Sequence, residues 1–179
     1  MKRLKVDTAR APAEPEGPIV ERTMYQVPLG NHVVLNFSSK RQALAWQAEA
    51  TRQLTDMLMS CNLMLAEAFT AYRMAWPYFG PGDGLQRHVR DAEAALDKAT
   101  NVNGPNAIYM RWRAMDDALA NIRAMALALA KMYADKSHAV PRHQCQVLAE
   151  RCSDMRTALQ QFGTDADRSK GYRPSPYSG

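Results

Sequence analysis

Apolar residues recur every three or four positions along most of the chain after residue 38, which is the pattern of amphipathic helices. The clearest segment is 108–133, where steps of four and three alternate as in a coiled-coil seam. The same spacing recurs in 85–99 and 145–162, and a longer apolar pattern fills 39–76 until Pro77 interrupts it. We therefore predict four helices.

Polar residues and turn formers mark the expected helix ends. Ser39 and Gln42 have the spacing of a capping box at the start of the first helix. Pro105 is expected as the first residue of the third helix, and Pro141 as the first residue of the fourth. Gly163 is a natural stop for the fourth helix.

The two ends of the chain have a different character. Residues 1–22 contain three prolines and mixed charges without sustained periodicity, which indicates an extended arm, and residues 163–179 predict a second extended tail. Two β-prone runs around a Pro/Gly/Asn turn predict a hairpin over 23–37. The predicted fold is mainly α: an antiparallel four-helix bundle over 38–162 with long first and third helices, preceded by a small β-hairpin and flanked by extended arms.

Two helical stretches, 57–66 and 124–130, are apolar on every side. A helix of this kind must be covered on every side. Either the hairpin and the N-terminal arm fold back over these stretches, or neighbouring subunits cover them. The second interpretation is favoured, because one short helix and one hairpin cannot surround both stretches. The candidate subunit interface is Met57, Met59, Leu63, Met64, Met125 and Leu127.

Composition narrows the class of protein without naming a function. The chain has 179 residues, of which 46% are hydrophobic, so it is too apolar for general disorder and long enough for one domain with extensions. Three cysteines, two of them within an apolar helical stripe, indicate reduced thiols and a reducing compartment. We expect a protein of the cytoplasm or of a particle assembled inside the cell, because the apolar stretches are too short to span a membrane.

No constellation of residues in the sequence predicts catalysis, a cofactor or a metal site. His143 and Cys145 are two positions apart on a helix, so they point to different sides, and no CxxC pair exists. Asp116 and Asp117 diverge by about 100° on a helix and cannot share a substrate. Phosphate-binding glycine motifs are absent from the sequence. We therefore expect a protein that is not an enzyme.

Basic residues suggest a partner with negative charge. The formal net charge is +5, from 23 basic and 18 acidic residues. In an up-down-up-down bundle, the connection between helices 1 and 2 and that between helices 3 and 4 lie at the same end. That end gathers the candidate contacts to an anionic partner, which are Arg73, Arg87, Arg90, Lys131, Lys136 and Arg142, together with three histidines.

Two functions remain open from the sequence. The first is a non-enzymatic scaffold or adaptor that forms a homo-oligomer or joins a larger complex, with its arms fastened to copies of itself and to other protein subunits. Connector, ring and adaptor subunits of phage particles have this general plan, so a virion component is one expectation by analogy of architecture. The alternative is a small basic accessory protein that binds RNA or DNA weakly, or docks a nucleic-acid enzyme, through its cationic end.

Overall fold

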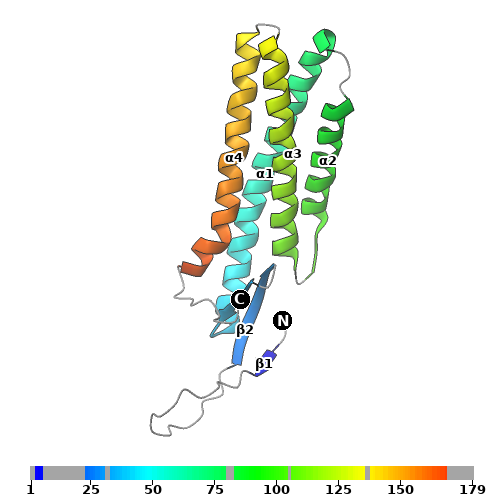
Figure 1. Cartoon of the computed structure of the whole chain (residues 1–179). Helices are drawn as coiled ribbons and strands as arrows, with labels where there is room; N and C mark the ends of the chain where they lie inside the picture. The colour runs from blue at the N-terminus through cyan, green and yellow to red at the C-terminus, as the bar shows by residue number, and fades with distance from the viewer. Residues whose placement is uncertain are drawn as a thin grey trace, which may run out of the picture.

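Four antiparallel helices form the body of the protein, as the sequence predicts (Figure 1). The computed structural model describes residues 3–5, 23–30, 33–79, 83–104, 106–135 and 138–168. The helices are α1 (Lys40–Phe79), α2 (Asp83–Asn101), α3 (Ala107–Asp135) and α4 (Ala139–Arg168). In Figure 1, α1 and α3 run upward while α2 and α4 run downward. Most of the two predicted arms lies outside the described residues.

The start of α1 confirms the predicted cap. The backbone N–H of Gln42 donates a hydrogen bond to the hydroxyl of Ser39 at 3.2 Å, which satisfies one of the donors left free at a helix start. The side chain of Gln42 accepts a hydrogen bond from the hydroxyl of Ser38 at 2.9 Å. The cap is therefore shared by two serines.

Three helix ends next to prolines differ from their predicted positions. α1 continues past Pro77 by two residues, because a proline in the last turn costs one hydrogen bond there. α4 begins two residues before Pro141, which its first turn accommodates because the first N–H groups of a helix have no partner. α3 begins two residues after Pro105.

The predicted stop at Gly163 is wrong, because α4 continues to Arg168. A single glycine inside a helix costs only about 1 kcal/mol relative to alanine. The next proline along the chain is Pro174, so no stronger helix breaker follows directly. The bundle therefore extends into the segment expected as a tail.

Helix α3 is the centre of the core. It contacts each of the other three helices. Its fully buried side chains include Met115, Leu119, Ile122, Met125 and Leu129. α2 has 19 residues against 40 in α1, so the ends of α1 and α3 project beyond α2 (Figure 1). The long first and third helices predicted from the sequence are confirmed.

A three-stranded antiparallel sheet precedes the bundle. Its order is β1 (Arg3–Lys5), β2 (Thr23–Gly30) and β3 (Val33–Phe37). The predicted hairpin is confirmed as β2 and β3, with Val27 opposite Leu35 and an irregular register at Pro28. β1 lies within the predicted arm, since three residues are too few for a strand pattern to be recognised in a sequence.

The sheet packs on the N-terminal part of α1 and closes one end of the bundle. Trp46 stands between two other rings, with centroids 6.0 Å from Phe37 and 6.4 Å from Phe162. Ala43 and Ala50 are buried in the same cluster. The described strands therefore cover the first turns of α1 and not the apolar stretch 57–66, so the hairpin does not shield that stretch as the less favoured alternative held. The N-terminal arm, the other part of that alternative, lies mostly outside the described residues.

We predict that Trp46→Ala lowers the free energy of unfolding by about 3–5 kcal/mol, because it empties the contact between the sheet and the bundle. Trp76→Ala is the matched control, since Trp76 is 44% exposed against 7% for Trp46. Denaturant titration of both variants measures the difference. Equal losses would show that the sheet does not depend on Trp46.

Candidate functional site

The six predicted interface residues separate into two groups in the structure. Met64 and Met125 are 4% and 0% exposed, so they fill the core of their own chain and cannot contact another chain in this fold. Met57 is half-buried and packs against the same core. Met59, Leu63 and Leu127 are 61%, 64% and 43% exposed.

The correction follows from helix geometry. Successive residues point about 100° apart, so an apolar stretch always directs some side chains to the core and others outward. The sequence shows that 57–66 is apolar throughout but not which of its sides meets α3. The structure directs Met64 inward and leaves Met59 and Leu63 outside.

Exposed apolar side chains gather on α1. Among the described residues, ten large hydrophobic side chains are exposed, and seven of them belong to this helix. Two of the other three lie on α4. The α1 members are Leu44, Met59, Leu63, Phe69, Met74, Trp76 and Tyr78, the α4 members are Val140 and Val147, and Leu127 stands on α3.

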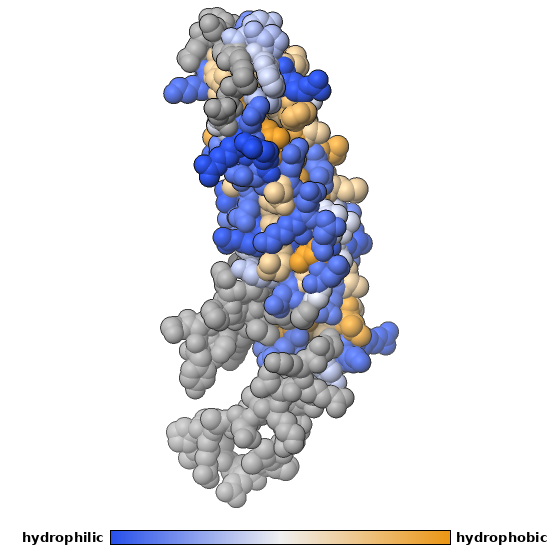
Figure 2. Space-filling view, turned by 90° about the vertical axis from the view of Figure 1, so that its right-hand side faces the viewer, coloured by the Kyte–Doolittle hydropathy of each residue, from blue (hydrophilic) through white to orange (hydrophobic). Residues whose placement is uncertain are grey.

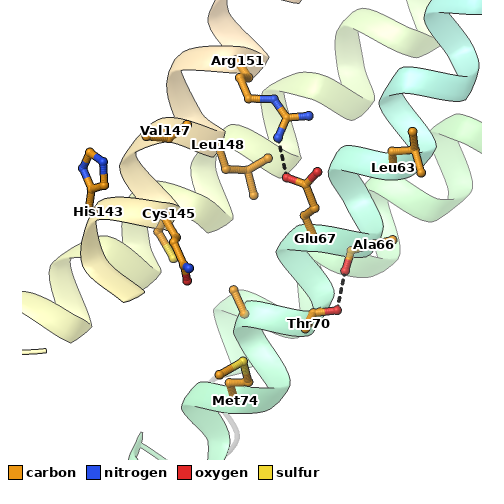
Figure 3. Close-up of a pocket in the computed structure, with 12 residues that line it drawn as sticks. Leu63, Ala66, Glu67, Thr70, Met74, His143, Cys145, Val147, Leu148 and Arg151 are labelled. Carbon is orange, nitrogen blue, oxygen red and sulfur yellow. Dashed lines mark hydrogen bonds and ion pairs between the residues drawn. The ribbon is translucent and has the colours of Figure 1, made fainter. Parts of the chain in front are cut away.

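A groove separates α1 from α4. Its volume is about 590 Å³, and its lining is largely apolar. Figure 3 shows Leu148 pointing from α4 toward α1, and His143 on α4 is also among the residues that line the groove. Arg151 on α4 reaches across to Glu67 on α1 with a 2.6 Å contact, which closes the groove at one point with an ion pair.

The side of the bundle shown in Figure 2, on the right of Figure 1, is mostly hydrophilic. Hydrophobic residues there form small groups between hydrophilic ones. Among the described residues, large apolar side chains therefore remain in contact with water mainly on α1 and the neighbouring edge of α4.

The predicted cationic end is brought together by the bundle topology. The ends of α1 and α3 and the starts of α2 and α4, which carry the described basic residues, lie toward the upper end in Figure 1. The exposed cations there are Arg73, Arg87, Arg90, Lys131 and Arg142. The prediction for Lys136 lies outside the described residues.

Some charges and rings at this end already have partners. The guanidinium of Arg73 lies 5.9 Å from the ring centroid of Phe69. Arg87 is 3.6 Å from the carboxylate of Asp91 while its side chain stays 80% exposed. His138 packs between the rings of Tyr78 and Tyr133, so it contributes to the packing of this end.

Several polar contacts between helices could not be read from the sequence. Arg156 binds Asp116 with two hydrogen bonds of 2.7 and 3.1 Å between α4 and α3. Trp112 packs against the core, and its indole N–H also donates a hydrogen bond to the carbonyl of Leu159 at 2.7 Å. These bonds join α3 to α4, and the sequence held no signal for the pairing because the partners are 40 or more residues apart.

The three cysteines are buried, as the sequence predicts. Burial raises the pKa of Cys61 to about 12 and that of Cys152 to about 11, and it also raises the pKa of Cys145. The Sγ of Cys152 lies 3.8 Å from the Sδ of Met64. These groups are neutral thiols at neutral pH.

The part of the chain that the structure describes contains no group of three His, Cys, Asp or Glu residues arranged for a metal ion. Within the same residues, no helix has both the length and the hydropathy needed to cross a membrane.

Comparison with protein-family models, with curated proteins and with solved structures finds no match to this chain. The surface of the bundle is therefore the basis for proposing a function.

We predict that none of the three thiols reacts with Ellman's reagent at pH 8 while the protein is folded, and that all three react in guanidinium. The folded-state pKa of Cys61 is raised from 9.0 to about 12, so the neutral thiol favours the folded state. This contribution to stability is complete below pH 9 and is lost as the pH rises toward 12. Rapid labelling of one thiol in the folded protein would contradict its burial.

Proposed function

We propose that this protein is a non-enzymatic assembly subunit that binds copies of itself or other protein subunits. The binding surface is the α1–α4 face, defined by Met59, Leu63 and Met74 on α1 and by Val140 and Val147 on α4. The observation that carries the proposal is the concentration of exposed apolar side chains there.

Covering this face releases free energy. Met59, Leu63 and Met74 are each 60–64% exposed. Burying the exposed part of such a side chain contributes roughly 1–2 kcal/mol of favourable free energy. Contiguous apolar patches on soluble proteins mark sites of interaction. Methionine side chains adapt to irregular partner surfaces, which suits two of the three residues on α1.

The middle of the α1–α4 face, from Met57 to Tyr72 on α1, can also be desolvated without stranding a charge. Between Met57 and Tyr72, the only ionisable group on the outer side of α1 is Glu67. Arg151 neutralises it at 2.6 Å, and about half of each side chain remains exposed. Unpaired charges are what makes burial of a surface unfavourable, and here the charges enter as a pair.

The overall plan agrees with an assembly role. A long helical body carries a small sheet at one end, and connector or ring subunits of phage particles are an architectural analogy for a body of this kind. In such an assembly, the arms predicted from the sequence would bind neighbouring subunits.

We predict that the protein self-associates at micromolar concentration and that Leu63→Glu reduces the association, because a charge then enters the apolar contact. Leu127→Glu is the matched control: Leu127 is also exposed, but it stands on the outer side of α3. Sedimentation equilibrium measures the mass of each species, and circular dichroism checks that the helices persist.

A wild-type protein that remains monomeric at micromolar concentration would contradict self-association. Equal weakening by both substitutions would show that the α1–α4 face is not the specific surface.

A second candidate function is weak binding of nucleic acid at the cationic end. It is favoured by five exposed cations that two helix connections bring to one end of the bundle. Each phosphate that such a site neutralises releases counterions, so binding weakens with salt. No row of Arg, Asn or Gln was apparent in the sequence for reading bases, and we propose no sequence specificity.

We predict that the triple variant Arg87→Glu, Arg90→Glu, Arg142→Glu abolishes any binding to a DNA oligonucleotide. The matched control reverses three exposed cations at the other end, Arg41, Lys98 and Arg113, so both variants change the net charge equally. Fluorescence anisotropy at several salt concentrations gives the slope of log affinity against log salt concentration. The magnitude of this slope falls by about one for each phosphate contact removed. Loss of binding in both variants would refute the site. A wild-type protein that does not bind the oligonucleotide at about 50 mM salt would refute it as well.

A further inference from the structure

The outer side of α1 carries a second apolar stripe, opposite the one that faces the core. Its members are Met59, Leu63, Ala66, Thr70 and Met74, and all five are exposed. The first four follow steps of four, three and four, which is the spacing of a helix–helix seam. α1 therefore has the pattern to pack on two sides, while the described part of its own chain covers only one of them.

The positions of the four outer members of the stripe are symmetric about the point between Ala66 and Glu67. Met59 and Met74 are its ends, Leu63 and Thr70 come next, and Ala66 and Glu67 are at the centre. When two such helices lie antiparallel, each residue meets its mirror position: Met59 meets Met74, and Leu63 meets Thr70. Such self-complementarity is the requirement of an isologous two-fold interface, in which the same patch serves both partners.

We propose that the occupant of the α1–α4 face is a second copy of this chain, related by a two-fold axis that passes between Ala66 and Glu67, with the two α1 helices antiparallel. This inference rests on the proposed assembly function and names its partner. Ala66 is the small residue at the centre, so the two backbones approach closely there. The flanking Leu63 and Met74 then reach the partner helix.

Charge is compatible with this arrangement. At the axis, each copy brings one Glu67 and one Arg151, already joined across the groove at 2.6 Å. Two such pairs side by side carry no net charge, and each guanidinium also comes near the carboxylate of the other copy. The centre of the interface therefore buries no unpaired ion, while Arg73, beside Met74 at its end, is exposed and lies against the ring of Phe69.

The size of the contact sets its strength. Met59 to Met74 spans about 22 Å along the helix axis at 1.5 Å per residue. With the adjoining edge of α4, the contact is about two helices wide. The total surface area that it buries is therefore near the ~1,000 Å² minimum for a specific interface. The α1–α4 groove of about 590 Å³ receives side chains of the partner. A dimer that dissociates in the micromolar range is the expected result.

Cysteine cross-linking tests the antiparallel register. The natural cysteines are buried, so Met59→Cys and Met74→Cys each introduce one accessible thiol. In the proposed dimer, residue 59 of one copy lies beside residue 74 of the other, whereas two residues 59 are about 22 Å apart. A mixture of the two variants therefore forms a disulfide-linked dimer on mild oxidation, shifting the 20.0 kDa band to the mass of two chains. Either variant alone does not.

Ala94→Cys, at an exposed position of α2, mixed with Met74→Cys measures accidental collisions. Cross-linking in the mixture above that background supports the two-fold dimer. Cross-linking of Met59→Cys alone at the level of the mixture, or a mixture no different from the background, overturns it. If the wild type still sediments as an oligomer in that case, the assembly function stands and only its two-fold form is wrong. A monomeric wild type refutes self-association and the two-fold dimer together.

Discussion

Helix α3 contacts all three other helices, and this packing determines which sides of those helices are buried and which stay exposed. Its buried side chains, among them Leu119, Ile122 and Leu129, fix α2 and α4 on its flanks and α1 against a further side. α1 and α4 contact each other much less than α3 and α4 do, which leaves the groove between them. Among the residues that the structure describes, the outer side of α1 is consequently left largely uncovered.

The unequal lengths of the helices determine how much of the outer side of α1 is exposed. α1 has 40 residues and α2 has 19, so α2 cannot cover its neighbour along the whole length. The described strands cover only the first turns, around Ala43 and Trp46. Between these turns and the cationic end, α1 keeps apolar residues where solvent-facing helices normally carry charges. Exposed apolar surface of this kind is characteristic of sites of interaction.

Much of the fold could be predicted from the sequence because helix packing leaves a periodic trace. The seam from Ile108 to Tyr133 predicted α3, and the serine cap predicted the start of α1. β1 and the last turn of α4 were missed, since a three-residue strand has no detectable period and a single glycine is a weak stop. The side of α1 that faces outward was beyond prediction, because Met59 and Met64 are chemically alike and only the position of α3 separates them.

Methionine oxidation tests most directly whether the outer side of α1 is covered in the assembled protein. Met59 and Met74 are 61% and 60% exposed in the single chain, whereas Met115 and Met125 are fully buried. With peroxide in excess, mass spectrometry follows each residue as the protein concentration is raised. The account predicts that oxidation of Met59 and Met74 slows together as the protein associates, while the buried methionines stay slow throughout. Rapid oxidation of Met59 and Met74 at every concentration would contradict it.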